Sequence, residues 1–125
     1  KNIDAIAREK GEDVLFVSFS EMTIENHNYK ELPERIELIN WLNDNNISFS
    51  LCYGMTSDYI IHQPYLGDLF LDVSFDTNDP LYIKLEKHLE NEDGSPKIPG
   101  VQFYYCSLEL AMQNSHHDKL EIFDE

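Results

Sequence analysis

The chain has 125 residues, and its 24 acidic and nine basic side chains give a formal net charge of −15. Because Lys and Arg supply the affinity for phosphate backbones, this balance argues against direct nucleic-acid binding and favours a positively charged partner. With 42% hydrophobic residues the chain can bury a core, so we expect a single globular domain over residues 1–125.

No run of apolar residues is long enough to cross a bilayer, and no basic segment precedes a short apolar one as in a secretory signal. We therefore expect a cytoplasmic protein with no membrane partner. Only two cysteines occur, Cys52 and Cys106, and each lies in a stretch typical of a strand. Reduced, buried thiols fit this usage better than a disulfide framework, and the lack of a CxxC pair argues against structural zinc or a redox site.

The N-terminal part of the chain predicts a short helix followed by a central strand. Residues 2–10 carry apolar side chains at helical spacing before Gly11, a suitable C-terminal cap. Residues 14–20 have apolar side chains on both faces, which is typical of a strand near the centre of a sheet. Residues 21–31 have no firm period and indicate a loop or an edge strand.

A longer helix is expected next. Pro33 suits the first helical position, and the Asn-rich residues 43–46 suit its end. Apolar residues recur at intervals of four, three and three, so the buried stripe is expected at Leu32, Ile36, Ile39 and Leu42.

Three strands are expected in the middle of the chain. Residues 47–53 alternate, and their buried face is expected at Ile47, Phe49, Leu51 and Tyr53. Residues 59–63 form a short edge strand or strand end, because Pro64 follows them. Residues 69–75 alternate again, with Leu69, Leu71, Val73 and Phe75 on one face. Asp72 and Asp76 are expected side by side on the outer face.

Asp79 and Pro80 predict a helix start, because the carboxylate accepts backbone N–H bonds and proline suits the first turn. The buried stripe of this helix is expected at Leu81, Leu85 and Leu89. Three acids follow one another at steps of four and three residues. They form a negative ridge made of Glu86, Glu90 and Asp93.

Residues 91–100 contain two prolines and two glycines and indicate a loop, and residues 101–107 predict a further strand. Residues 108–114 suit a short helix, and the tail from Lys119 is either a last strand or frayed. The element order predicts an α/β or α+β fold. It has a single mixed, partly antiparallel sheet of four to six strands with helices packed on it.

Motifs for catalysis or cofactor binding are lacking: there is no GxGxxG, GxxxxGK[ST], GxSxG or HExxH. His116, His117 and Asp118 follow one another, but adjacent helical residues point about 100° apart, so they do not by themselves form a metal site. His88 lies near the apolar stripe of its expected helix, where a partly buried or surface histidine is the simpler interpretation than a catalytic base.

Asp72 and Asp76 on one strand face would have Cα atoms about 13 Å apart, too far to share one metal ion. A metal-dependent nuclease also needs basic residues to hold its substrate. A catalytic triad assembled in space leaves no mark in the sequence, and nothing here selects one. We therefore expect a protein that is not an enzyme and needs no metal or cofactor.

The acids gather between Arg35 and Lys84, a stretch without any other Lys or Arg. It contains Glu37, Asp44, Asp58, Asp68, Asp72, Asp76 and Asp79. Tyrosines are interleaved with these acids in residues 53–68. Tyrosine gives an interface rigid contact area, and carboxylates pair with Arg and Lys, so this region suits recognition of a basic protein. The alternative is that the tyrosines pack on the sheet edge.

In length, acidity and mixed element order, and in the acidic stretches 53–79 and 86–93, the chain resembles the small immunity proteins of bacterial contact-dependent growth inhibition systems. The resemblance implies a cytoplasmic inhibitor that binds a cognate toxin domain, often a basic nuclease, and covers its active site or substrate-binding surface.

On this hypothesis the partner is a cationic toxin domain. The expected partner-binding residues are Asp58, Tyr59, Tyr65, Asp68, Asp72, Asp76, Glu86, Glu90 and Asp93. Two alternatives stay open. One is a nucleic-acid mimic that inhibits a DNA- or RNA-binding protein, and the other is a small ligand-binding domain or an enzyme of unknown reaction.

Overall fold

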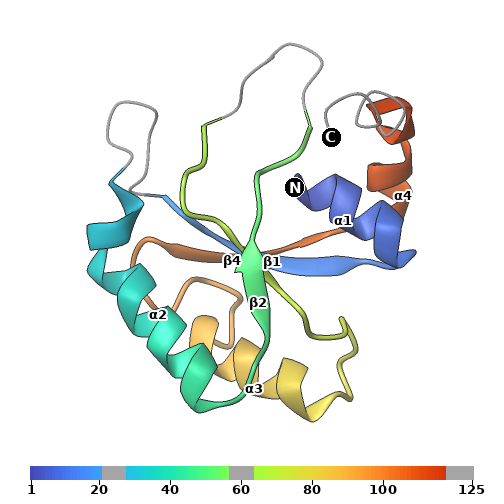
Figure 1. The fold of residues 1–125 in the computed structure, drawn as a ribbon. Helices are drawn as coiled ribbons and strands as arrows, with labels where there is room; N and C mark the ends of the chain where they lie inside the picture. Colours follow the sequence, from blue (N-terminus) through green and yellow to red (C-terminus); the bar gives the residue numbers. More distant parts are fainter. Residues whose placement is uncertain (21–27, 57–63, 118–125) are drawn as a thin grey trace.

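The computed structural model describes residues 1–20, 28–56 and 64–117, and in these residues helices lie on both faces of a four-stranded sheet (Figure 1). The elements are α1 (Ile3–Lys10), β1 (Val14–Phe19), η1 (Tyr29–Glu31), α2 (Pro33–Asp44), β2 (Phe49–Leu51), β3 (Leu69–Leu71), α3 (Pro80–Leu89), β4 (Val101–Cys106), α4 (Leu108–Met112) and η2 (Ser115–His117). The expected strand at residues 59–63 and the tail from Lys119 lie outside the described residues.

The strand order is β2-β3-β1-β4, and every pair of neighbours is antiparallel. Phe16 of β1 faces Phe70 of β3 on one side and Tyr104 of β4 on the other. The predicted sheet with packed helices is therefore confirmed in its α+β form. The position of β1 between two partners also confirms the prediction that its two apolar faces place it near the centre.

One core lies between the sheet and the pair α2 and α3, on the lower side of the sheet in Figure 1. Leu15, Val17 and Phe19 point to this side from β1. They meet the buried residues Leu38 and Leu42 of α2 and Tyr82, Leu85 and Leu89 of α3. These contacts fix α3 against the sheet and so set the direction of its outer face.

A second core lies on the opposite side of the sheet, under α1 and α4. Both cysteines are buried there as free thiols, as expected. Burial raises the pKa of Cys52 to about 12 and that of Cys106 to about 11, so both thiols stay protonated at neutral pH. The chain thus builds two cores, one on each face of the sheet.

The helix ends follow their local chemistry. Asp79 caps α3 by accepting the Leu81 N–H at 2.8 Å, and Pro80 follows it, as predicted. Gly11 ends α1 with φ 68°, a left-handed conformation that favours glycine. These signals fix where the helices begin and end.

The predicted buried faces of α2 and α3 are shifted by one residue, at two positions of α2 and at one of α3. Leu38 is buried in α2, and Ile39 is only partly buried. In α2, Ile36 is 44% exposed. Arg35 is buried in its place, because its guanidinium donates to the Gly67 carbonyl and the Tyr65 hydroxyl. In α3, Leu81 is 39% exposed and Tyr82 is buried, because the larger aromatic ring packs against neighbouring rings in the core.

The strands at 47–53 and 69–75 are shorter than predicted. In the first, Leu51 is 56% exposed and Cys52 is buried, so the expected alternation fails at the end of β2. In the second, β3 ends at Leu71. The Val73 N–H bonds the Leu71 carbonyl and the Asp76 N–H bonds the Ser74 carbonyl, so tight turns replace the sheet ladder. Val73 and Phe75 nevertheless contact the predicted core.

Candidate functional site

Asp58 and Tyr59, two of the expected partner-binding residues, lie outside the described residues. Tyr65 is half-buried and packs edge to face against Tyr29, with ring centroids 4.7 Å apart. Its hydroxyl accepts a bond from Arg35 at 3.1 Å and donates to the Asp68 carbonyl at 2.8 Å. Burial raises the pKa of Tyr65 to about 12. Tyr65 is thus part of an internal packing cluster, which supports the packing alternative for this residue.

Asp68 is also partly withdrawn from solvent. Desolvation of its carboxylate raises its pKa to about 6. Its backbone carbonyl additionally accepts the Cys52 N–H at 3.2 Å, which ties this position to the end of β2. Asp68 therefore offers a partner less exposed carboxylate surface than a fully solvated acid does.

The next two acids of the stretch are exposed but have partners within the chain. Asp72 forms an ion pair with Lys10 at 3.1 Å. Asp76 accepts the Asn78 N–H at 2.9 Å in the turn before α3. The expectation that Asp72 and Asp76 share one strand face is wrong, because β3 ends before both of them. Their carboxylates serve local structure.

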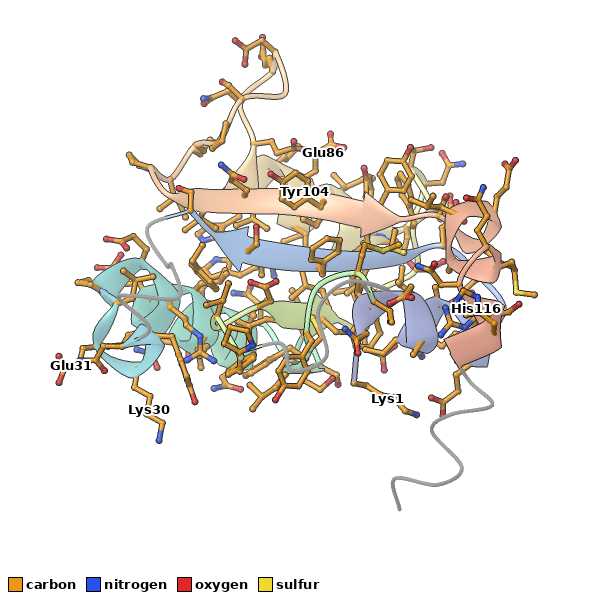
Figure 2. The ribbon with its side chains drawn as sticks, turned by 90° about the horizontal axis from the view of Figure 1, so that it is seen from above. Lys1, Lys30, Glu31, Glu86, Tyr104 and His116 are labelled. Carbon is orange, nitrogen blue, oxygen red and sulfur yellow. The ribbon has the colours of Figure 1, made fainter. Side chains whose placement is uncertain are left out.

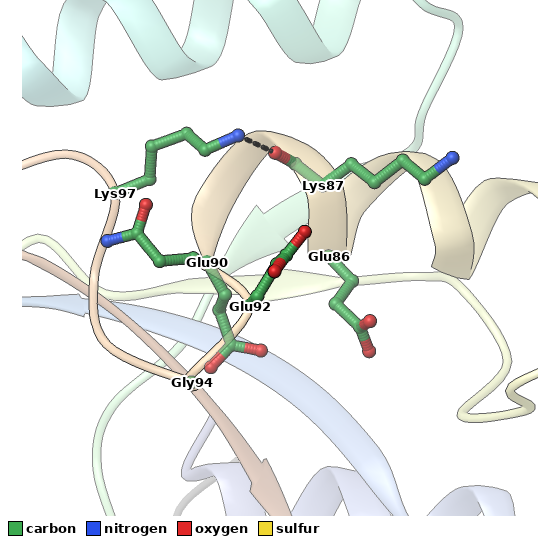
Figure 3. Close-up of a pocket in the computed structure, with 7 residues that line it drawn as sticks. Glu86, Lys87, Glu90, Glu92, Gly94 and Lys97 are labelled. Atoms are coloured by element: carbon green, nitrogen blue, oxygen red, sulfur yellow. Dashed lines mark hydrogen bonds between the residues drawn. The ribbon is translucent and has the colours of Figure 1, made fainter.

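A second acidic group lies at the end of α3, where a hollow of about 550 Å³ opens between the helix and the following loop (Figure 3). We call it the acidic hollow. Its lining consists of Glu86, Lys87, Glu90, Asn91, Glu92, Gly94 and Lys97. The loop folds back on the helix, since the Lys97 N–H bonds the Leu89 carbonyl and the Asn91 N–H bonds the Ser95 carbonyl, each at 2.9 Å. The hollow therefore has a defined backbone frame.

The carboxylates of the acidic hollow differ from those of the previous stretch. Glu86, Glu90 and Glu92 form no ion pair with any residue that the structure describes. The ammonium group of Lys97 donates to the Lys87 carbonyl at 2.6 Å, so one of the two lining lysines is engaged with backbone (Figure 3). The lining thus holds three glutamates and two lysines, and none of the three carboxylates is ion-paired within the described residues.

The titration of nearby groups agrees with this negative environment. Burial, followed by the charge of Glu86, raises the pKa of Glu90. Burial, followed by a hydrogen bond and charge from Glu86 and the charge of Glu90, raises the pKa of Tyr82 to about 12. Ionisation of either group adds a negative charge close to those already present, and this is unfavourable. A cation from another molecule would reduce this repulsion.

Asp93, the last member of the predicted negative ridge, does not line the hollow. Its carboxylate accepts the N–H and the hydroxyl of Ser95, at 3.0 and 2.6 Å, and these bonds lower its pKa. Glu92, which was not among the expected residues, lines the hollow in its place. The helical spacing could not reveal this exchange because the helix ends at Leu89.

An aromatic groove of about 380 Å³ adjoins the acidic hollow between α3 and β4. Its lining consists of Leu15, Phe75, Tyr82, Glu90, Phe103, Tyr104 and Tyr105. Tyr105 is 58% exposed, and its ring centroid lies 4.9 Å from that of Phe75. Glu90 borders both the acidic hollow and the aromatic groove. Figure 2 shows Glu86 and Tyr104 on the β4 side of the sheet.

Sequence reasoning identified Glu86 and Glu90 but missed the aromatic groove. The available signal was the segment VQFYYC, a six-residue strand with adjacent tyrosines and no charged residue. Two tyrosines next to each other in a strand point to opposite faces, so at least one of them must find a place outside a single core. Its neighbours Phe75 and Tyr82 come from other elements, and the sequence does not reveal their approach.

Histidines and acids do not assemble a metal site in the part of the chain that the structure describes, where no group of three or more His, Cys, Asp or Glu side chains has suitable geometry. His88 stacks on Trp41, with ring centroids 3.9 Å apart and planes at 5°, and burial lowers its pKa. His116 is exposed on η2. Among the described residues, no helix has the length and apolar character required to span a membrane.

Comparisons with protein-family models, with curated proteins and with solved structures find no match to this chain.

Proposed function

We propose that the chain is a cytoplasmic, non-enzymatic inhibitor that binds a cationic toxin domain, in the manner of the immunity proteins of contact-dependent growth inhibition systems. The observation that carries the proposal is the contact between the aromatic groove and the acidic hollow at Glu90. A partly buried carboxylate next to exposed aromatic rings is the combination that binds Arg and Lys side chains on a partner.

Two physical effects support this assignment. Aromatic side chains supply much of the binding energy at interfaces because they bury a large rigid area, and Arg is enriched opposite them. Carboxylates without an ion-pair partner among the described residues steer a cationic protein toward the surface, and a net charge of −15 extends that attraction over the whole molecule. The toxin's basic substrate-binding surface is the natural counterpart, because it has evolved to hold phosphates.

Capture from a lysate of the source cells, with the chain immobilised, tests the proposal. We expect a basic protein to be retained at low salt and released as the salt concentration rises, because exposed charges are screened. The retained domain should arrest growth when it is expressed alone, and coexpression of this chain should restore growth. A triple variant with Glu86, Glu90 and Glu92 replaced by Lys should lose both capture and protection.

A matched control has the same change in net charge elsewhere on the surface. The replacement of Glu12, Glu37 and Asp44 by Lys alters three exposed acids outside the acidic hollow and the aromatic groove, and it should preserve protection. If both triple variants lost capture and protection equally, the overall charge of the chain, and not the acidic hollow, would explain the binding. If the retained protein bound nucleic acid but was not toxic, the result would instead favour the alternative that the chain is a nucleic-acid mimic.

A further inference from the structure

Among the described residues, strand β4 lies at the edge of the sheet and has one side without a strand partner. It pairs with β1 over six residues, from Val101 to Cys106, and no other strand among the described residues lies beside it. Alternate backbone N–H and C=O groups along its other side therefore have no strand partner in that part of the chain. An unpaired edge of this kind is a template for another strand.

The sequence of β4 has none of the features that commonly protect an edge. Its six residues, VQFYYC, contain no charged residue, no proline and no glycine. The opposite edge is different, because β2 has only three residues, and a short edge strand is itself a protection. A long uncharged edge invites aggregation unless a partner covers it, so the β4 edge is the one that needs an occupant.

The two faces of β4 offer different surfaces to an added strand. Phe103 and Tyr105 point toward α3, where Tyr105 meets Phe75. Tyr104 points to the other face, where its ring centroid lies 5.5 Å from that of Phe16. Side chains of an added strand would alternate between these faces in the same way. Every second residue would therefore enter the aromatic groove.

The negative charges at the aromatic groove favour an added strand that carries basic side chains. Glu90 is the charged residue in the lining of the aromatic groove, and Glu86 lies beside it in the acidic hollow. Lys or Arg side chains can lay their aliphatic stems over Tyr105 and bring their charged ends to these carboxylates. A second copy of the chain is a poor occupant, since each copy carries a net charge of −15 and the copies repel each other.

We propose that the open edge of β4 accepts an extended basic segment of the partner as a fifth strand. Basic side chains of this segment enter the aromatic groove and reach Glu90 and Glu86, and apolar side chains on the other face contact Tyr104. The backbone bonds supply affinity and the alternating side chains supply selectivity. This inference rests on the proposed function, because it names how the cationic partner is bound.

A labelled peptide of alternating Lys and Val, as long as β4, tests the inference by fluorescence anisotropy and amide hydrogen exchange. We expect the peptide to bind and to slow exchange at β4 amides. The same peptide with its interior backbone amides N-methylated keeps its charge but cannot donate strand bonds, so its affinity should fall by about tenfold or more. A peptide of alternating Glu and Val should not bind.

Two variants with matched exposure serve as the protein-side control. Tyr105→Lys places a positive charge in the groove on β4, and Leu51→Lys places one on the opposite edge strand, where the wild-type side chains are 58% and 56% exposed. We expect the Lys–Val peptide to lose affinity for Tyr105→Lys and to bind Leu51→Lys as it binds the wild type. Thermal unfolding checks that both variants are folded.

Three results would overturn the inference. Equal binding of the plain and N-methylated peptides, without slower exchange in β4, would show attraction by charge alone and leave the proposed function standing. Lack of binding by both peptides would show that the edge does not accept a basic strand, and growth protection by the chain would then be the separate test of the function. A dimer in sedimentation that Tyr105→Lys dissociates would make a second copy the occupant.

Discussion

The two acidic regions of this chain look alike in sequence and differ in the folded molecule. Between Asp68 and Asp79 the described carboxylates are withdrawn from solvent, paired with Lys10 or bonded to backbone N–H groups. Between Glu86 and Glu92 three carboxylates surround a hollow without an ion pair to another described residue. The internal partners of a carboxylate therefore decide whether its charge is available to another molecule.

Asp4 is the strongest case of an internally satisfied carboxylate and should give the largest effect. It is buried, pairs with Arg8 at 3.0 Å and accepts bonds from the N–H and hydroxyl of Thr56. Asp4→Asn removes the negative charge that faces Arg8 and weakens the acceptor of the Thr56 bonds, so we expect a loss of about 3 to 5 kcal/mol in the free energy of unfolding.

The matched control is Asp72→Asn, which breaks the exposed pair with Lys10 and should cost about 0 to 1 kcal/mol. Urea unfolding at neutral pH measures both variants. Similar losses would mean that burial does not separate the two kinds of ion pair. The bonds at Asp4 also lower its pKa against the opposing effect of burial, so its contribution should be present above the unfolded pKa and disappear as pH falls through the lower folded pKa.

The orientation of α3 decides where the second acidic region points, and a pair of leucines tests it. Leu85 is fully buried, whereas Leu81 is 39% exposed. Leu85→Ala should cost about 2 to 5 kcal/mol of stability, because it removes core contacts and leaves a cavity. Leu81→Ala should stay within about 1 kcal/mol. Comparable large losses in both variants in chemical denaturation would restore the helix face that the leucine spacing predicts and would turn Glu86 and Glu90 elsewhere.

Substitution of Asp68 should give the smallest change in the free energy of unfolding, and it should stabilise the fold where the other substitutions destabilise it. Its pKa is raised from 3.8 to about 6 in the folded chain, so across this interval the folded state holds a proton that the unfolded chain has released. The free energy of unfolding therefore falls as pH rises from 3.8 to about 6 and stays reduced above it.

Asp68→Asn should remove this pH dependence and raise the stability at pH 7 by about 1 to 2 kcal/mol, a value reduced for the partial exposure of the carboxylate. Thermal unfolding followed across the pH range measures it. Glu37→Gln, at an exposed position on α2, is the control and should leave the pH dependence intact. A decrease in stability at pH 7 would show that the Asp68 carboxylate makes favourable interactions within the fold, as the Asp72 carboxylate does with Lys10.

Much of the fold could be predicted because local chemistry decides it. Asp79 followed by Pro80 marks the start of α3, and the apolar run of residues 14–20 marks a central strand. The errors arise where tertiary contacts override the local pattern. Arg35 is buried because distant acceptors in Gly67 and Tyr65 satisfy it, and an apolar stripe cannot anticipate such bonds.

The site was predictable only in part, for the same reason. The spacing of Glu86 and Glu90 places them on one side of a helix, and they do line one hollow. The expected continuation to Asp93 fails because α3 ends at Leu89 and the chain turns back at Ser95. The aromatic groove joins β4, α3 and the loop before α3, and only the folded chain brings these segments together.

The proposed mode of binding requires that the Glu90 carboxylate is available to the partner, and isothermal titration with the protein captured from the lysate measures this. Glu90→Gln and Asp72→Asn each remove one negative charge with little change in shape. We expect Glu90→Gln to weaken binding by at least about 1.5 kcal/mol, roughly tenfold in Kd, with a smaller salt dependence, and Asp72→Asn to bind as the wild type does. Loss of affinity in Asp72→Asn with full affinity in Glu90→Gln would contradict the account and return the binding surface to the first acidic region.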